Sequence, residues 1–430
     1  MNSQGPFSRL RSILPSVQNF LETLKDDLAN KRSVLLLLPP TLKEEDIWPL
    51  LRAYIAGRGF YSEEIITKDL PVEKPLLATL ASSLRAQWNS NVSPLSIEHF
   101  YNNVAGLPDV AYFEGFDELS CDDRQKILQF FIEWSGTSHI IMDQGINPLA
   151  LCIITSSPEA LISTPATDTH LGVHWWWGMP SALEIKLICR MLGNNQDESM
   201  SLWMESILPS IAGSDTALAD HLWDYHDLTI DGIMQKLNSY ALIRNWDIAL
   251  LRNECIEEYE DSFTFHSKKT SLLGSKKNKH LWSMGILYWT PEYGIQLSTA
   301  VLALLGKEKE VQNRIWRGLI EYMLPMLDQM RLKICEKLTN FYGPSWPYKW
   351  IRPKYDEDYE AVQNDTLECE IGHLNHLLKV CVHMKADRNL VPLVNQARYV
   401  RNALAHYRPV DYLQYDKLMQ EAKIISDDQL

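Results

Sequence analysis

The stretch DVAYFEGFDEL, residues 109–119, places an apolar run directly before a cluster of acidic side chains. A short apolar run bounded by polar residues is typical of a buried strand in a parallel sheet. In doubly wound α/β folds, ligands bind beyond the carboxyl ends of such strands. The acids at this end, Glu114, Asp117 and Glu118, are therefore candidate site residues.

The segments on both sides of this stretch continue the pattern of an α/β fold. A short apolar strand followed at once by a helix is the start of an α/β unit. Strands are expected at 33–38, from residue 150 onward and at 172–177. Helices are expected at 7–31, 44–56, 122–134 and 181–192. The order predicts an N-terminal α/β domain built on a parallel sheet.

Over residues 30–190 this order resembles the core of NACHT-like and other STAND nucleotide-switch ATPases. In that family an apolar strand ends in Asp-Gly-Leu-Asp-Glu, and a later strand ends in Thr-Ser-Arg-Pro. The matching positions here are Glu114 to Glu118 and Thr155 to Pro158. The resemblance implies an NTPase-like core over residues 1–190 and a helical lid or linker over residues 191–295.

The chain departs from that family where nucleotide would bind. It contains no G-x-x-x-x-G-K-[ST] motif, and the first strand is followed by Pro39-Pro40-Thr41-Leu42-Lys43. Because proline has no N–H, this segment lacks donors that a phosphate-binding loop needs. We therefore expect a degenerate core that does not hydrolyse ATP and instead binds either an ATPase or sensor partner or a retained, non-hydrolysed ligand. Asp117 and Glu118 either hold Mg²⁺ or are a remnant, with Asp117 or Ser120 capping the next helix.

The last 135 residues are predicted to be helical, with a domain over residues 296–430. A long amphipathic helix is expected at 315–338 and a shorter one at 367–384. Further along, Leu393, Ala397, Val400 and Leu404 recur at spacings of four, three and four, which is one buried stripe of a helix. Pro409 should end this helix, so His406 is expected at or just beyond its last turn.

Arg401 lies five residues before His406, roughly 7.5 Å down the helix axis. Its long side chain can swing toward the imidazole, and Asn402 can orient the ring. A histidine can move protons near neutral pH, and an arginine presents donors to phosphate oxygens. Because RNA carries its own nucleophile, the 2′-OH, its cleavage needs no metal.

Arg401-Asn402-Ala403-Leu404-Ala405-His406 resembles the signature of HEPN domains, which are helical modules of many RNA-cutting toxins and defence nucleases. The resemblance implies a metal-independent endoribonuclease with Arg401, Asn402 and His406 in its site. It also implies a homodimer in which two such helices face each other. The alternative is that Arg401 and His406 cap the helix C-terminus, where the helix dipole favours cations.

Several cations and one aromatic residue are candidate RNA contacts. One basic segment, residues 268–279, could contact phosphates or be a solvated loop. The segment from Trp346 to Lys354 combines rings and cations, which suits base stacking, although it could equally pack over the bundle. The candidate RNA-binding residues are Lys268, Lys269, Lys276, Lys277, Lys349, Arg352 and Tyr407.

A metal site is not expected in this chain. His373 and His376 are spaced i, i+3 and Glu370 is near, which places three possible ligands on one helical face. No clear fourth ligand accompanies them, so these residues are more simply polar-face residues, some of which could line an RNA path. We expect no cofactor.

Composition limits the alternatives. The net charge of −14 excludes a general positive field for coating nucleic acid, so any RNA surface must be local. The seven cysteines form no C-x-x-C pair, there is no secretory signal, and no apolar run reaches a membrane span. We therefore expect a cytoplasmic protein. The alternative function is a non-catalytic protein that binds an ATPase partner and dimerises or holds RNA through its helical part.

Overall fold

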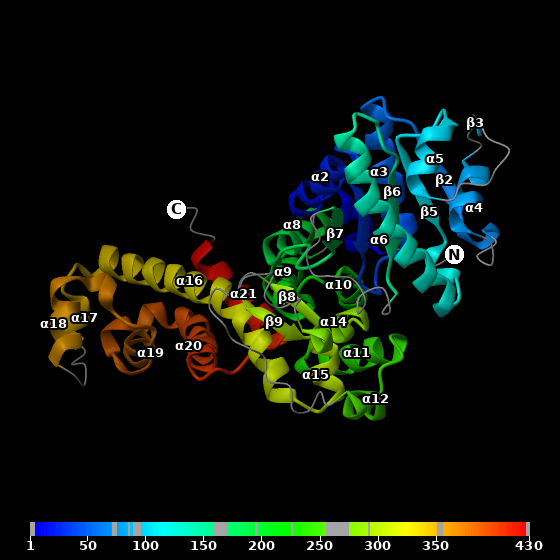
Figure 1. The fold of residues 1–430 in the computed structure, drawn as a ribbon. Helices are drawn as coiled ribbons and strands as arrows, with labels where there is room; N and C mark the ends of the chain where they lie inside the picture. Colours follow the sequence, from blue (N-terminus) through cyan, green and yellow to red (C-terminus); the bar gives the residue numbers. More distant parts are fainter. Residues whose placement is uncertain are drawn as a thin grey trace.

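The structure is a computed structural model that describes residues 5–70, 75–84, 87–88, 96–157, 170–193, 197–224, 227–254, 275–290, 293–350 and 356–426. It consists of an α/β region followed by a mainly helical region, which confirms the predicted fold class at that level. In Figure 1 the C-terminal helices extend away from the α/β region along the long helix α16. None of the described helices is both long and apolar enough to cross a membrane.

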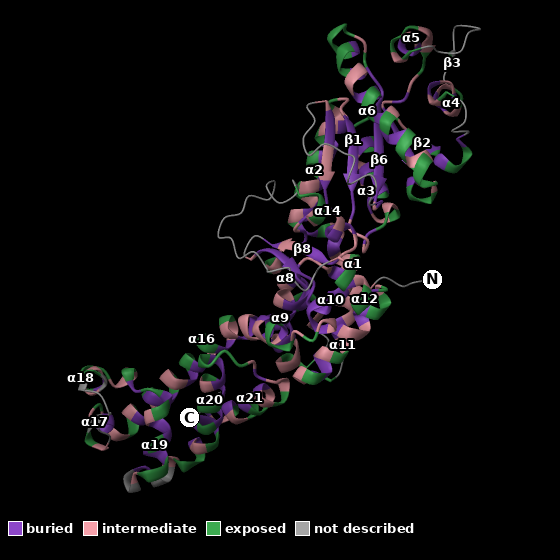
Figure 2. Cartoon of the chain, turned by 60° about the horizontal axis from the view of Figure 1, so that its bottom comes forward, coloured by how far each residue is buried: buried purple, intermediate pink, exposed green. Residues whose placement is uncertain are grey.

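A five-stranded parallel sheet forms the centre of the α/β region, in the order β2-β5-β6-β1-β7. Val34 pairs with Cys152 and with Gly172, which places β1 between β6 and β7. The inner strands are almost completely buried (Figure 2), as their apolar runs predict. The strands are β1 (Ser33–Leu37), β2 (Ser62–Ile66), β5 (Val110–Glu114), β6 (Ala150–Thr155) and β7 (Leu171–Trp175).

Helices α2, α3 and α6 pack against this sheet, and two short strands lie apart from it. All five parallel strands end at one edge, so the loops after β1, β5 and β6 are neighbours. The other elements of the region are α1 (Pro6–Leu10), η1 (Arg11–Ile13), α2 (Pro15–Ala29), α3 (Glu44–Gly57), η2 (Thr67–Asp69), α4 (Leu76–Ser83), β3 (Gln87–Trp88), α5 (Ile97–Asn103), β4 (Val104–Ala105), η3 (Phe116–Glu118), α6 (Cys121–Asp143) and α8 (Ala182–Gly193).

The described residues in the middle of the chain form helices and one two-stranded antiparallel hairpin, β8–β9. The buried guanidinium of Arg314 joins this hairpin to the helices around it. It donates to the Leu297 carbonyl oxygen at 2.8 Å and to the Thr299 hydroxyl at 2.6 Å. The elements are α9 (Glu198–Ala212), α10 (Thr216–Trp223), α11 (Ile230–Ile243), α12 (Ile248–Asn253), α14 (Lys276–Ser283), β8 (Leu287–Thr290), β9 (Gly294–Leu297) and α15 (Thr299–Leu304).

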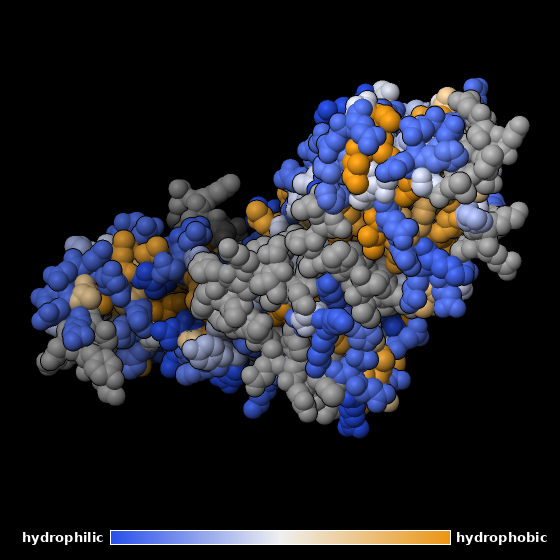
Figure 3. Space-filling view, in the orientation of Figure 1, coloured by the Kyte–Doolittle hydropathy of each residue, from blue (hydrophilic) through white to orange (hydrophobic). Residues whose placement is uncertain are grey.

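The C-terminal helices are arranged along α16, the longest helix described. Helices α19, α20 and α21 pack in sequence, and α20 and α21 also contact α16. Figure 3 shows hydrophobic side chains gathered on the α/β part of the face in view and a mainly hydrophilic surface over these helices. The elements are α16 (Glu308–Tyr342), α17 (Trp346–Trp350), α18 (Asp356–Asn364), η5 (Thr366–Glu368), α19 (Ile371–Val380), η6 (Val382–Leu390), α20 (Val391–Ala405) and α21 (Tyr412–Ser426).

Four details differ from the sequence-based expectations. The single helix expected at 7–31 is broken before Pro15, which lacks the N–H that would continue it. The edge strand β2 was not expected, because its sequence SEEII is mostly polar. Residues 276–279 form the start of α14 and not a loop. Residues 294–297 form β9, so the boundary predicted between 295 and 296 falls inside a strand.

Helices α9 and α16 approach each other at Gly318. A Cβ atom at this position would overlap the Ser206 carbonyl oxygen and lie 2.9 Å from the Ile207 Cα atom. Both neighbours are backbone atoms of α9, so no side chain can rotate away to make room. The absence of a side chain at residue 318 is therefore what lets the two helices pack at this distance.

Gly318→Ala is expected to lower the free energy of unfolding by about 1–3 kcal/mol, because the added methyl group overpacks this contact. Denaturant unfolding followed by circular dichroism measures the change. Gly136→Ala in α6 is the control, since a Cβ there has no neighbour within 4 Å. That substitution should be neutral or stabilise by up to about 1 kcal/mol. Equal stability of the two variants would contradict the importance of the contact.

Candidate functional site

The candidate catalytic residues lie at the C-terminal end of α20. The helix ends at Ala405, and His406 is its C-cap residue with φ −104° and ψ 24°. Tyr407 follows in the left-handed conformation with φ 56°. The Arg408 N–H donates to the Ala403 carbonyl oxygen at 2.9 Å, which is a Schellman ending. The helix thus ends at the predicted place, through backbone hydrogen bonds that precede Pro409. The His406 side chain is exposed at this end.

Arg401 does not approach His406 within this chain. Its guanidinium lies 3.7 Å from a carboxylate oxygen of Glu370 and donates to the Asn402 side-chain oxygen at 3.4 Å. It lines a cavity of about 200 Å³ between α16, α19 and α20, together with Glu370 and Arg331. Among the contacts of the described residues, Asn402 therefore orients Arg401 and not the imidazole, and the three candidates do not form one pocket.

Arg331 forms the other basic side of this cavity. Its guanidinium contacts Asp328 at 2.8 Å and donates to the carbonyl oxygens of Leu367 and Cys369. These contacts hold the backbone just before α19, and so they position Glu370 in front of Arg401. The sequence had suggested Glu370 only as a weak metal ligand, because the residues that place it are far apart along the chain.

Tyr407, a predicted RNA contact, packs against α16. Its ring centroid lies 5.1 Å from that of Trp316, and 73% of its surface remains exposed. The Trp316 indole N–H donates to the Leu404 carbonyl oxygen at 2.7 Å. These two contacts fix the end of α20 on α16 and hold the His406 position outside the bundle.

At the carboxyl edge of the sheet, Asp117 joins the ends of β5 and β6. Its carboxylate accepts hydrogen bonds from the Ser156 N–H at 2.8 Å, from the Ser156 hydroxyl at 2.7 Å and from the Thr155 hydroxyl. Ser120 caps α6 by accepting from the Asp123 N–H, so of the two predicted caps it is Ser120 that acts. The carboxylate of Asp117 is thus used in holding two loops together.

Glu44 closes the same edge from α3. Its carboxylate accepts from the Gly115 N–H and from the Tyr112 hydroxyl, both at 2.9 Å. Burial raises the pKa of Glu44 although both hydrogen bonds favour its charged form. Gly115 has φ 74°, a conformation that glycine adopts without strain, and this turn directs its N–H toward Glu44. Glu114 and Glu118 are exposed nearby.

The loop after β1, where a nucleotide phosphate would bind in a P-loop protein, is acidic and leaves little space for a ligand. The first turn of α3, directly after the loop from β1, presents Glu44, Glu45 and Asp46. These carboxylates already complement the positive end of the helix dipole and would repel a phosphate. The cavity that Pro39 and Thr41 line measures only about 40 Å³. Small-molecule sites are usually roughly 300–1,000 Å³.

The described lysines among the predicted RNA contacts lie on two different helices, α14 and α17. Lys276 and Lys277 lie in the first turn of α14, and the nearby Lys279 is buried over the Trp175 ring at 5.3 Å. Its burial makes Lys279 a packing residue and also lowers the pKa of its ammonium group. Lys349 lies exposed on α17. Lys268, Lys269 and Arg352 lie outside the described residues.

The three possible metal ligands on α19 do not converge. His376 is exposed, whereas the Nδ1 atom of His373 is buried without a hydrogen-bond partner and Glu370 faces Arg401. Within the described part of the chain, no group of three or more His, Cys, Asp or Glu side chains could hold a metal ion. His376 and Glu370 are therefore surface residues, and His373 is a packing residue.

Comparisons with known proteins add no identification. No model of a protein family matches this chain, and no curated protein matches it in sequence. Among solved structures, a chain in the structure of Drosophila ORC bound to DNA aligns over 98% of this chain and 91% of that chain. The two are 10% identical with a TM-score of 0.28, which is too low to indicate a shared fold.

Asp117→Ala is expected to lower the free energy of unfolding by about 1–2 kcal/mol, because the Ser156 N–H and the buried Thr155 hydroxyl lose their acceptor. Glu118→Ala is the matched control on the same turn and should change stability by less than about 0.5 kcal/mol. Thermal and denaturant unfolding measure both. Equal effects of the two substitutions would show that the link between β5 and β6 contributes nothing.

The purified protein is expected not to hydrolyse ATP in the presence of Mg²⁺, because the acidic first turn of α3 would repel a phosphate and the cavity that Pro39 and Thr41 line is too small. Phosphate release is the measurement, with the Asp117→Ala variant as the background. A melting temperature that does not change with MgATP is expected as well. Turnover by the wild type that the Asp117→Ala variant lacks would contradict this expectation.

Proposed function

We propose that this chain is a metal-independent endoribonuclease of the HEPN type, acting as a toxin or defence effector, whose site is completed when two copies meet. The observation that carries the proposal is the end of α20, where the Arg401 and His406 side chains are exposed and Asn402 is half-buried. Side chains that only packed the bundle would be buried, whereas the exposed Arg401 and His406 remain accessible to RNA or to a second chain.

The exposed face of α20 suits a contact between two copies. Asn395, Tyr399, Asn402 and His406 recur at spacings of four, three and four, so they lie on one face. Tyr399 leaves 54% of its surface exposed on this face. A two-fold axis through such a surface would bury both tyrosines and bring the two His406 side chains toward each other. Arg401 of one copy could then reach the phosphate beside His406 of the other.

The chemistry follows from these residue types. His406 would accept the proton of the RNA 2′-OH, and the freed oxygen would attack the adjacent phosphorus atom. The bond from phosphorus to the 5′-oxygen then breaks, and that oxygen takes a proton from an imidazolium. Arg401 would stabilise the added negative charge on the phosphoryl oxygens. The products are a 2′,3′-cyclic phosphate and a 5′-hydroxyl, and no water or metal is consumed.

For the α/β region we propose a docking or sensing role without nucleotide hydrolysis, as in a degenerate STAND-like core. Support comes from the carboxyl edge of the sheet, where Asp117 and Glu44 use their carboxylates for internal hydrogen bonds. A surface held in one conformation by its own side chains suits recognition of a partner better than it suits a reaction cycle. An ATPase or sensor protein is the partner that the resemblance implies.

A second function, non-catalytic binding, is favoured by one specific observation. Arg401 contacts Glu370 and Asn402 in its own chain, so its charge is partly satisfied without RNA or a second copy. In that case the exposed end of α20 would dimerise or hold RNA without cutting it. The two cations would then act as helix C-terminal caps.

Arg401→Ala and His406→Ala are each expected to reduce RNA cleavage at least about 100-fold, because each removes a group that acts in the transition state. The assay incubates total RNA with protein in EDTA and detects 2′,3′-cyclic phosphate ends. Specific activity should also rise with protein concentration until the dimer is formed.

Arg408→Ala is the control, since this exposed cation lies just beyond the same helix end. It should keep full activity. If all three variants cut RNA like the wild type, the catalytic assignment is wrong and the residues act as caps. A dimeric wild type that binds RNA without producing cyclic phosphate ends would favour the non-catalytic function.

A further inference from the structure

The outer face of α6 exposes two isoleucines on either side of a glycine. Ile132 leaves 37% of its surface exposed and Ile140 leaves 52%. Gly136 lies midway between them, so the three residues are spaced i, i+4 and i+8 along one helix face. Figure 3, in the orientation of Figure 1, shows hydrophobic side chains among hydrophilic ones on the surface over this helix. The opposite side of α6, with Phe131 and Trp134 fully buried, packs against the sheet.

Gly136 is not explained by packing within the described part of the chain. A Cβ atom at this position would have no neighbour within 4 Å, and the residue lies inside a regular helix. A glycine in the middle of a helix costs roughly 0.5–1 kcal/mol of stability relative to alanine. A missing side chain at the centre of an exposed face allows the backbone of another helix to approach closely.

The polar residues of this face are arranged symmetrically about Gly136. Glu133 lies three residues before the glycine and His139 three residues after it. Gln129 lies seven residues before it and Asp143 seven residues after it. All four side chains are exposed. Each pair combines groups that can bind each other, a carboxylate with an imidazole N–H and an amide N–H with a carboxylate.

Two copies of α6 placed antiparallel across a two-fold axis at Gly136 would meet in matching pairs. Such an axis brings each residue that precedes Gly136 opposite the residue that follows it by the same number. Ile132 of one copy then packs on Ile140 of the other, and every contact occurs twice. Glu133 likewise faces His139. At 3.6 residues per turn each of these residues lies within about 60° of Gly136 around the helix, so all of them face the same way.

The contacts that these polar side chains already make are compatible with the pairing. The Gln129 amide donates to the Glu133 carboxylate at 3.3 Å, and both side chains are exposed. A carboxylate accepts up to about four hydrogen bonds, so Glu133 can accept another. The His139 ring lies 4.5 Å from the ring of His170, tilted by 36°. This ring contact does not use the nitrogen atoms of His139 as hydrogen-bond donors.

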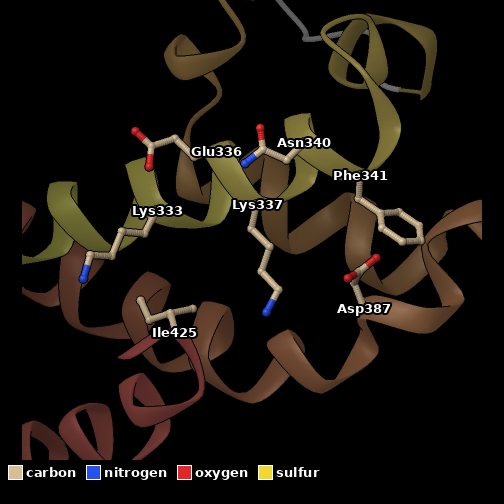
Figure 4. A pocket seen from close by; sticks show the side chains of 7 residues that line it. All are labelled: Lys333, Glu336, Lys337, Asn340, Phe341, Asp387 and Ile425. Atoms are coloured by element: carbon tan, nitrogen blue, oxygen red, sulfur yellow. The ribbon is translucent and has the colours of Figure 1, made fainter. Parts of the chain in front are cut away.

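A cavity of about 440 Å³ beside the second half of α16 shows no such complementarity. Figure 4 shows Lys333 and Lys337 on the same helix as Glu336, with Asp387 across the opening. Cations and carboxylates together line this cavity, so it favours neither an acidic nor a basic ligand. The face of α6 differs because its charged and polar groups complement a second copy of the same face.

We propose that α6 is a docking surface for a second copy of this chain, with the two helices antiparallel and crossing at Gly136. The proposal does not depend on the ribonuclease function, and it names an interface separate from the end of α20. Figures 1 and 2 place α6 and α20 in opposite parts of the molecule. The stretch from Gln129 to Asp143 is about 21 Å long. A contact of one helix per copy is small, so we expect a reversible dimer with a Kd of roughly 1–100 µM.

The first test is sedimentation velocity of the full chain without RNA, over roughly 1–200 µM. Every variant carries Tyr399→Glu, which disrupts the proposed α20 contact, so any remaining dimer forms elsewhere. Ile132→Glu/Ile140→Glu should raise the dimer Kd at least about tenfold, because the apolar contacts are lost and like charges face each other. Leu183→Glu/Leu187→Glu, an exposed apolar pair on α8, is the matched control and should dimerise like the background protein. A monomeric background protein, or equal losses in both variants, would overturn the proposal.

Disulfide cross-linking tests the position of the axis. Gly136→Cys places two identical thiols on the axis, so glutathione disulfide should oxidise them to one disulfide that joins two chains. Gln125→Cys on the same face is the control, because its two thiols would lie about 33 Å apart in the antiparallel pair. Cys121, Cys255 and Cys381 are changed to Ser in both proteins. Equal cross-linking at the two positions, or none at Gly136→Cys, would overturn the arrangement.

The polar pairs are tested by exchanging their charges. Glu133→Lys and His139→Glu should each raise the dimer Kd roughly three- to tenfold, because each breaks two symmetric contacts. The double variant Glu133→Lys/His139→Glu should regain the background affinity, since opposite charges again face each other across the axis. A double variant that dimerises no better than the single variants would show that these residues do not meet. RNA cleavage by any variant bears on the ribonuclease assignment and leaves these measurements unaffected.

Discussion

The backbone of α16 can lie directly on α9 because residue 318 has no side chain, and the arrangement of the two regions depends on this contact. Helix α9 also packs against α8 at the end of the α/β region and against α21. It therefore lies between the sheet and the C-terminal helices. Arg314, one turn before Gly318, adds buried hydrogen bonds to the β8–β9 hairpin. The start of α16 is thus held on two sides, while its far half extends away.

The carboxyl edge of the parallel sheet is closed by hydrogen bonds within the protein. In ligand-binding α/β proteins, the polar groups at this edge of the sheet bind the ligand. Here Asp117 and Glu44 bind backbone and hydroxyl donors from neighbouring loops. Of the acidic residues that suggested a nucleotide site from the sequence, Asp117 therefore stabilises the loops. A short motif shows which groups are present and not what they contact.

Apolar runs and helical periodicity in the sequence predicted the inner strands of the sheet and most of the long helices. The apolar runs of β1, β5 and β6 were recognised because inner parallel strands bury both faces. The edge strand β2 was missed, since Ser62, Glu63 and Glu64 are polar and give no apolar run; the Glu64 carboxylate accepts hydrogen bonds from Trp48 and Arg52 of α3. The hairpin β8–β9 was not predicted, because each of its strands is only four residues long.

The sequence likewise predicted some features of the candidate site and missed others. The buried stripe of α20 and the exposed position of His406 follow from helical periodicity and the helix end. The direction of the Arg401 side chain does not, because it depends on Glu370, 31 residues earlier in the chain, and on Arg331, which positions the segment before α19. Long side chains with several rotamers choose among partners that only the tertiary structure brings near.

The length of α16 gives it the properties of a lever arm. From Gly318 to Tyr342 the helix spans 24 residues, or about 36 Å. A turn of roughly 10° at the α9 contact would therefore displace its far end by about 6 Å. A small adjustment at the α9 contact would therefore be amplified at the far end of α16, where α17 and α18 lie.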